Sequence, residues 1–223
     1  MQTQLRFAVL LLVYLCNPFS LSAGAQEKSK QEALDDRVKE FLEQQRSGWN
    51  DMNIPWRDGQ FLHDVIIQNR YTRALEIGTS TGHSAIWIAW ALSKTGGRLI
   101  TIEIDEGRHK LALENFRKAG LSDLIDARLA DAHDLVRELK GPFDFVFSDA
   151  DKYWYRQYFI DLAPKITPGG CYATHNISIS HGEFRGNTKE YMDYLKSLPD
   201  FETSVEDSRS SGIAVSYKKR KVD

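Results

Sequence analysis

Two short apolar runs end in polar side chains that can do chemistry. The run 143–150, FDFVFSDA, leads into Asp149 and is followed by Lys152, while a later run ends on His175 and Asn176. Carboxylates, amines and imidazoles move protons or bind metal ions. A buried strand that leads directly into a carboxylate also needs a partner for that charge. These residues are therefore candidates for acid–base or metal chemistry.

A second group of candidates surrounds the stretch LEIGTSTGHS. Gly78 and Gly82 allow the backbone to turn tightly and to approach a ligand closely. Their G-x-x-x-G spacing fits neither a dinucleotide fingerprint nor a phosphate loop, and no Lys follows Gly82, which disfavours nucleoside triphosphate hydrolysis. Glu103 follows about 20 residues later, where a carboxylate can accept hydrogen bonds from both hydroxyls of a ribose. A plain strand-to-helix turn and a surface carboxylate explain these features equally well.

The elements that position these residues alternate between strand and helix from residue 72 onward. The expected strands are 73–78, 98–105, 125–131, 143–150 and 169–177, with a hairpin of 201–207 and 212–219. The expected helices are 83–94, 107–120, 133–140, 155–166 and 187–198. The alternation predicts an α/β fold, a doubly wound, mostly parallel seven-stranded sheet with a C-terminal antiparallel hairpin. Ligands of such sheets bind beyond the carboxyl ends of the strands, where all of these polar residues meet.

The first 25 residues differ from the rest. MQTQLR precedes the apolar run FAVLLLVYL, and AGA occupies 23–25, which predicts a secretory signal peptide cleaved between Ala25 and Gln26. We therefore expect an exported protein, periplasmic or secreted, without a stable membrane anchor. An uncleaved signal would leave it cytoplasmic or membrane-anchored. Residues 26–223 predict a single domain with lead-in helices over 26–46 and 61–69, separated by a break over 51–60 that contains Pro55 and Gly59.

Charge and cysteine content limit the partners. The net charge of −2 offers no polyanion-binding surface, so nucleic acid is excluded as a partner. Only Cys171 remains after cleavage, and it cannot form an internal disulfide. A homodimer is left open.

The segments ALEIGTSTGHSA, LITIEID, LADAHD and FDFVFSDADKYWY together form a recognisable set. In this order and spacing they resemble the class I S-adenosylmethionine-dependent O-methyltransferases, above all the catechol and caffeoyl-CoA O-methyltransferase-like group. The resemblance covers about residues 50–218. It implies a Rossmann-like methyltransferase fold, S-adenosylmethionine (SAM) as cofactor, and a small molecule with a hydroxyl group, a phenol above all, as acceptor.

The resemblance also implies roles for individual residues. Glu103 would hold the ribose, and Lys152 would be the base for the acceptor hydroxyl. Asp131, Ala132 and His133 would flank the adenine. The full set of implied cofactor contacts is Met52, Ile54, Glu76, Gly78, Ser80, Ser84, Glu103, Asp131, Ala132, His133 and Asp149.

The end of the fifth expected strand departs from the metal-dependent members of the group. There the strand ends in Asp-Asn, which binds a divalent metal together with the fourth-strand Asp, whereas this chain has His175 followed by Asn176. Replacing a carboxylate by an imidazole disfavours Mg²⁺, which prefers oxygen ligands. Three interpretations of His175 stay open. It is a transition-metal ligand with Asp149 and Asn176, a catalytic base or substrate contact in a metal-free enzyme, or a structural residue.

Other functions also stay open at this point. Transfer to nitrogen or to a protein side chain would use the same cofactor, and so would a non-catalytic module that binds SAM or a related nucleoside. Lys152 together with Asp149 and Asn176 favours an enzyme, because a pure binding module does not need that combination. His181 and Arg185, in the stretch 178–187, are candidate substrate contacts.

Overall fold

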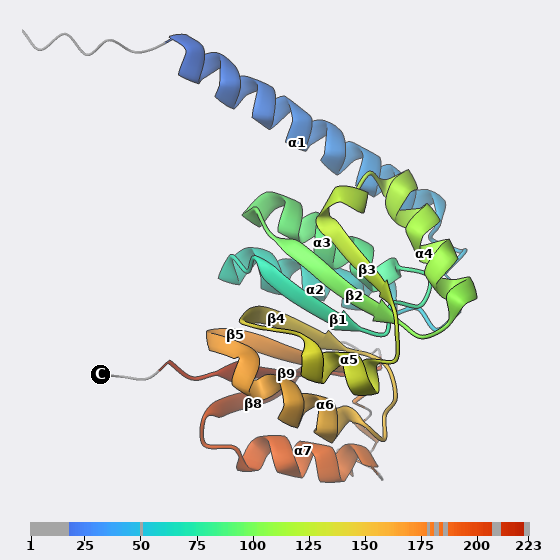
Figure 1. Ribbon diagram of the computed structural model, residues 1–223, viewed down its shortest axis with the longest axis vertical. Coiled ribbons are helices and arrows are strands. Elements are labelled where there is room, and N and C mark those ends of the chain that lie inside the picture. The colour runs from blue at the N-terminus through green and yellow to red at the C-terminus, as the bar shows by residue number, and fades with distance from the viewer. Residues whose placement is uncertain are drawn as a thin grey trace, which may run out of the picture.

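The computed structural model describes residues 18–49, 51–177, 179–180, 183–184, 187–206 and 211–220. Its centre is a seven-stranded sheet with the strand order β3-β2-β1-β4-β5-β9-β8 (Figure 1). The strands are β1 Arg73–Ile77, β2 Arg98–Glu103, β3 Ile125–Leu129, β4 Phe143–Ser148, β5 Ile166–His175, β8 Phe201–Glu206 and β9 Ile213–Lys218. Strands β1 to β5 pair in parallel, while β9 is antiparallel to both β5 and β8. The predicted fold class and C-terminal hairpin are confirmed.

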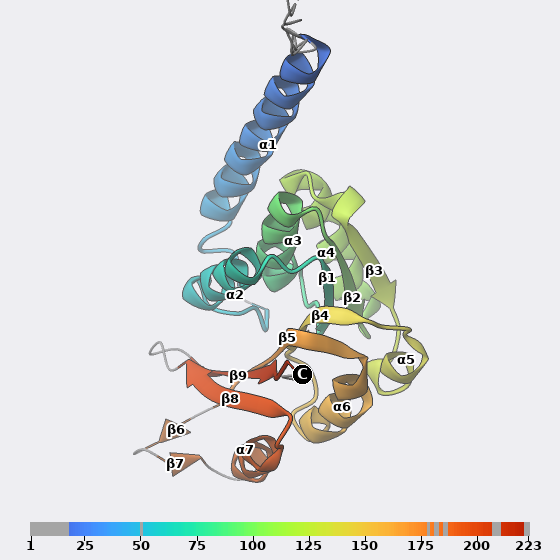
Figure 2. The same ribbon diagram turned by 90° about the vertical axis from the view of Figure 1, so that its left-hand side faces the viewer.

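Helices cover both faces of this sheet (Figure 2). The helices are α1 Pro18–Gln44, α2 Trp56–Asn69, α3 His83–Thr95, α4 Glu106–Ala119, α5 Ala132–Glu138, α6 Tyr155–Leu162 and α7 Asn187–Ser197. Neighbouring strand residues face opposite cores. Ala74 packs with the core under α2, α3 and α4, whereas Leu75 packs with the core under α5, α6 and α7. Burial on both faces explains why these strands read as continuous apolar runs. A short separate pair, β6 (Ile179–Ser180) and β7 (Glu183–Phe184), precedes α7.

Helix α1 begins at Pro18 rather than at residue 26 and runs through the predicted cleavage site. Its early turns project from the body of the molecule in both views (Figures 1 and 2). Near its other end Val38 and Leu42 are fully buried, and Asp35 pairs with Lys94 of α3. Among the helices of the described ranges none is long and apolar enough to cross a membrane. Residues 1–17 lie outside those ranges, so the signal peptide stays a prediction.

Helix α2 starts earlier than the sequence indicated, inside the expected break. Pro55 caps its first turn with φ −57°, which is a favourable value for a helix start. Gly59 is required by packing, because a Cβ there would lie 2.2 Å from the Trp87 indole. The early start places Asp58 on a helical turn that is packed into the core, where Asp58 is fully buried. The prediction of a loop at this position was wrong.

Candidate active site

The glycine loop after β1 lies against the segment after β4. Gly78 has φ +97°, and a Cβ on it would lie 2.4 Å from the carbonyl oxygen of Asp149. Gly82 has φ +99°, and a Cβ on it would lie 2.6 Å from the Phe116 ring. Both positions therefore need glycine for conformation and for space. The loop makes the tight turn and the close approach that its sequence indicates.

Glu103, at the end of β2, is held by main-chain donors. The backbone N–H of Ser80 donates to its Oε2 at 2.7 Å, and those of Ile104 and Asp105 donate to Oε1 at 3.0 and 2.9 Å. Ser80 reaches this position with a left-handed φ of +48°. Each carboxylate oxygen can accept more than one hydrogen bond, so Glu103 keeps acceptor capacity for a ligand.

The segment from Asp51 to Ile54 crosses over this loop. Asp51 forms an ion pair with Arg108 of α4, with Nε and Oδ2 3.0 Å apart. The Asn53 side chain donates to the Thr81 hydroxyl at 2.9 Å. Met52 is 68% exposed, whereas Ile54 is buried. The Ser80 hydroxyl also donates to the Asp51 carbonyl oxygen, so the segment is tied to the loop on both sides of Met52.

The far end of the site is formed by the turn between β3 and α5. Asp131 caps α5 and accepts a hydrogen bond from the backbone N–H of His133 at 2.8 Å. The His133 ring also lies 3.1 Å from the same carboxylate and packs against Trp154, with ring centroids 4.0 Å apart. The Tyr158 ring of α6 is nearly parallel to the His133 ring, with centroids 5.7 Å apart, and also lies 6.1 Å from Trp154. These contacts fix the direction of the Asp131 and His133 side chains.

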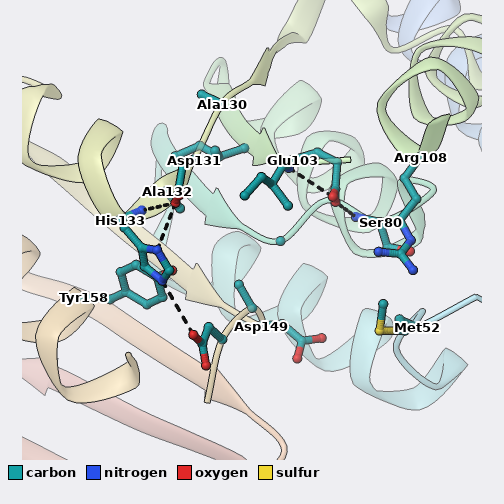
Figure 3. A pocket seen from close by; sticks show the side chains of 15 residues that line it. Met52, Ser80, Glu103, Arg108, Ala130, Asp131, Ala132, His133, Asp149 and Tyr158 are labelled. Carbon is teal, nitrogen blue, oxygen red and sulfur yellow. Dashed lines mark hydrogen bonds and ion pairs between the residues drawn. The ribbon is translucent and has the colours of Figure 1, made fainter. Parts of the chain in front are cut away.

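A cavity of about 320 Å³ lies between these groups (Figure 3). Of the implied cofactor contacts, its lining contains Met52, Gly78, Ser80, Glu103, Asp131, Ala132, His133 and Asp149. Ile54, Glu76 and Ser84 are buried outside that lining. The sequence interpretation missed Arg108 and Tyr158, which also line the cavity. Arg108 gave no signal because it belongs to a helix rich in charged residues.

Glu76 lies on β1, below the glycine loop, and is fully buried. Burial raises the pKa of its carboxyl group to about 8, against the opposing effect of hydrogen bonds from Ser84 and Thr101. The Thr101 hydroxyl donates to Glu76 Oε2, so these two side chains form a buried polar pair in the core under the loop.

His175, at the end of β5, lies between two carboxylates. Its Nδ1 is 3.0 Å from Asp149 Oδ2, and its Nε2 is 2.9 Å from Asp58 Oδ2. Burial of the ring favours the neutral form, but the two carboxylates outweigh it and raise the pKa of His175 to about 9. The imidazole is therefore charged at neutral pH. We refer to Asp58, His175 and Asp149 as the buried triad.

A model of a family described as O-methyltransferase matches residues 25–209, most of the sequence. The chain belongs to this O-methyltransferase family. A catechol O-methyltransferase of Niastella koreensis is 36% identical over 135 residues, which are 59% of this chain and 61% of that protein. A caffeoyl-CoA O-methyltransferase of Populus kitakamiensis is 34% identical over 130 residues, covering 56% of this chain and 55% of that protein. The chain thus spans little more than half the length of these relatives.

A solved structure extends the likeness to the fold. The O-methyltransferase from Bacillus cereus, in complex with SAH, superposes with a TM-score of 0.71 at 25% identity. The match covers 82% of this chain and 91% of that one. The family match includes β1 to β5 and β8, whereas β9 lies beyond its end at residue 209.

The metal site of the metal-dependent O-methyltransferases does not fit the residues present here. Both ring nitrogens of His175 face carboxylate oxygens, so the imidazole has no lone pair to offer a cation. Asn176, the other residue at the strand end, has a left-handed φ of +57°. Within the described part of the chain no group of three His, Cys, Asp or Glu side chains is arranged to hold a metal ion. The transition-metal interpretation of His175 is not supported by this donor set.

Two further predicted roles can be compared with the geometry. His175 has no free nitrogen with which to accept a proton, so its arrangement suits a supporting role better than that of a base. Lys152 is exposed in the turn after β4 and outside the cavity lining, and its role as base stays a prediction. His181 and Arg185 lie outside the described residues. Asp58 was missed altogether, because an Asp next to Arg and Gly in an expected loop gives no sign of burial.

Proposed function

We propose that the protein is a SAM-dependent O-methyltransferase that acts on a phenolic hydroxyl of a small molecule. The observation that carries this proposal is the cavity at the carboxyl edge of the sheet, with Glu103 at one end and Asp131 and His133 at the other. In a chain of the O-methyltransferase family, these are the positions that the sequence resemblance assigns to the ribose and the adenine of the cofactor.

The residues present fit such a cofactor. Glu103 is oriented by three backbone N–H groups and keeps capacity to accept hydrogen bonds from the ribose hydroxyls. Asp131 and Ala132 border the part of the cavity that suits the adenine, next to the Tyr158 ring. Gly78, which lacks a side chain, leaves room for the part of the cofactor that carries the methyl group.

The transfer reaction needs alignment and removal of a proton. When bound, SAM supplies a methyl group attached to a positively charged sulfur. The acceptor oxygen would take this methyl group at its carbon, and the sulfur would leave as a neutral thioether. Holding the two partners in line can lower the barrier by about 7–11 kcal/mol. Asp149 is the carboxylate that borders the cavity beside Gly78, and Lys152, three residues further on, is the group to which we assign the proton of the acceptor hydroxyl.

The phenolic class of the acceptor rests on the relatives. One is named a catechol O-methyltransferase and another a caffeoyl-CoA O-methyltransferase, and both names refer to aromatic hydroxyl acceptors. Because the chain matches only part of each, these names support the class of acceptor and leave its identity to experiment.

The experiment is an incubation of the protein with labelled SAM and a panel of phenols. Transfer of label to at least one phenol is expected, and Glu103→Ala should weaken SAM binding in calorimetry at least tenfold, as expected for loss of charge-assisted hydrogen bonds. Glu106→Ala is the matched control, because Glu106 is exposed in the next helix and pairs only with Lys110 among the described ion pairs. Absence of SAM binding would refute the proposal, and binding without transfer to any acceptor would favour the non-catalytic module.

We also propose that the protein is exported through its first 25 residues. The family match begins at residue 25, which supports treating the preceding apolar stretch as an addition to the enzyme. N-terminal sequencing of the protein from its native host should begin at Gln26. A mature chain that still starts at residue 1 or 2 would contradict this proposal.

A further inference from the structure

We propose that His175 takes the place of a divalent cation in this enzyme, so that methyl transfer requires no metal and the acceptor requires no second hydroxyl beside the first. His175 and Asp58 act as positioning residues for Asp149. The inference rests on the proposed function. It adds which residues hold Asp149 in place at the acceptor end of the site and which class of phenol that end accepts.

The directions of the hydrogen bonds show first that the His175 ring has no nitrogen free for a metal ion. Ionised carboxylates only accept, so a ring with both nitrogens 2.9 and 3.0 Å from Asp58 and Asp149 donates at both positions. If one of the Asp groups held the proton instead, the ring would still have no free lone pair. In either case the buried triad carries one net negative charge, and neither ring nitrogen is available to a metal.

Burial carries the second step. Asp58 is fully buried, and the side chain of His175 is 4% exposed. Asp149, with 13% of its side chain exposed, is the member of the triad that reaches the cavity, where Figure 3 shows it in the wall. The three residues come from the first turn of α2, the end of β4 and the end of β5. The triad thus fixes Asp149 from behind, through contacts between distant parts of the chain.

Charge carries the third step. A divalent cation that used His175 as a ligand would have to separate the ring from at least one carboxylate. Breaking a buried ion pair in this way leaves an uncompensated charge in the core. The positive charge that a metal would supply is already present on the ring, at hydrogen-bond distance from both carboxylates. A metal is therefore neither needed to neutralise Asp149 nor easily admitted beside it.

The class of acceptor follows from the lack of a free ligand position. A metal ion can bind two neighbouring oxygens of a catechol at once, which makes the second hydroxyl part of recognition. The His175 ring has no donor left for a second oxygen. A phenol with one hydroxyl should therefore be methylated about as well as the matched catechol.

The wild-type protein provides the first test. After dialysis against EDTA, we expect unchanged methyl transfer to phenol and to catechol, with kcat/KM values within tenfold of each other. Calorimetric titration of the wild type with Mn²⁺, Mg²⁺ and Zn²⁺ should show no one-to-one binding at Asp149. Binding at this residue would be recognised by its loss in Asp149→Asn. Such binding together with loss of transfer in EDTA would overturn the inference, as would a preference for catechol of more than about 100-fold. If no phenol is methylated, the proposed function fails, whereas the titration still decides whether a metal binds here.

Variants of the triad provide the second test. His175→Asp restores an oxygen ligand beside Asp58, Asp149 and Asn176, and we expect it to bind Mn²⁺ one-to-one where the wild type does not. Asp58→Asn should lower kcat about 100-fold with little change in SAM affinity, because a small misplacement of Asp149 disturbs alignment more than binding. Asp64→Asn, on the exposed side of the same helix, is the control and should leave both values unchanged. Equal losses of kcat and SAM affinity in Asp58→Asn would indicate a merely structural role.

Discussion

Two histidines, His83 and His175, can be compared because they are buried to almost the same extent. Their residues are 2% and 3% exposed. His83 opens α3, where its Nδ1 lies 2.9 Å from the Ile54 carbonyl oxygen and its Nε2 accepts the Trp87 indole N–H at 3.1 Å. One acceptor and one donor are the partners of a neutral imidazole, and burial lowers the pKa of His83 to about 4.

His175 has nearly the same degree of burial, but its ring is charged at neutral pH, whereas that of His83 is neutral. Desolvation acts on its ring in the same direction, but Asp149 and Asp58 raise its pKa to about 9. The comparison shows that burial alone does not decide the charge of a histidine in this protein. The chemistry of the two groups that face the ring nitrogens decides it, and around His175 both groups are carboxylates.

The largest effect is expected from removing one of those carboxylates. Asp58→Ala leaves His175 with a single carboxylate partner in the core, and it should lower the free energy of unfolding by about 3–5 kcal/mol. Denaturant unfolding at neutral pH measures the change. Asp64→Ala, two turns from the triad and half-exposed, should stay within about 0.5 kcal/mol of the wild type. A loss below about 1 kcal/mol in Asp58→Ala would mean that the triad holds no buried charge.

The next effect concerns pH and should have opposite signs for the two rings. The folded pKa of His175 lies above that of a free histidine, so its stabilisation is fully present below about pH 6.5 and is lost as the pH rises through about 9. The folded pKa of His83 is lowered, so its contribution is fully present above about pH 6.5 and is lost as the pH falls through about 4. Across each of these pH ranges the contribution of the histidine to the free energy of unfolding should change by roughly 3 kcal/mol.

Comparing the stability of the wild type with that of single variants separates the pH dependence of each histidine from that of other groups. Glu76 also titrates between the two histidines, because burial raises its pKa to about 8, but it is common to wild type and variants. The stability difference between wild type and His175→Gln should shrink from pH 6.5 to 9, and that for His83→Gln should shrink from pH 6.5 to 4. Long-range ¹H–¹⁵N spectra should show His175 charged and His83 neutral at pH 7. A neutral His175 in those spectra would break the comparison.

Much of the fold was predictable because it depends on local pattern. Strand-length apolar runs alternate with helical periodicity, and the parallel sheet followed from that alternation. The carboxyl edge of the sheet then brought Glu103, Asp131 and Asp149 to one cavity. These residues could be found because a polar side chain directly after a buried strand is visible in the sequence.

The triad could not be predicted in the same way. Asp58 lies 117 positions from His175 in the chain, and its burial depends on an early start of α2 that the Pro and Gly nearby argued against. The charge of His175 depends on that distant partner. His83 is similar, since its neutral state depends on a carbonyl oxygen 29 positions away. Charge states in this core follow from tertiary contacts, which a single sequence does not contain.

The smallest expected effect concerns His83, the neutral histidine of the comparison. Trp87→Phe removes the indole donor to Nε2 of His83 and should cost about 1–2 kcal/mol of stability, the usual range for a lost buried hydrogen bond with a smaller ring. The Nε2 resonance of His83 should then shift, because it loses its donor, while Nδ1 keeps its proton toward the Ile54 carbonyl and the His175 resonances stay unchanged. Trp90→Phe is the matched control, because its indole donates to Asp35 instead. It should cost a similar amount and leave the His83 spectrum as it is. A shift of both histidines in Trp87→Phe would mean that the two rings are coupled and that their charges are not set by their own partners.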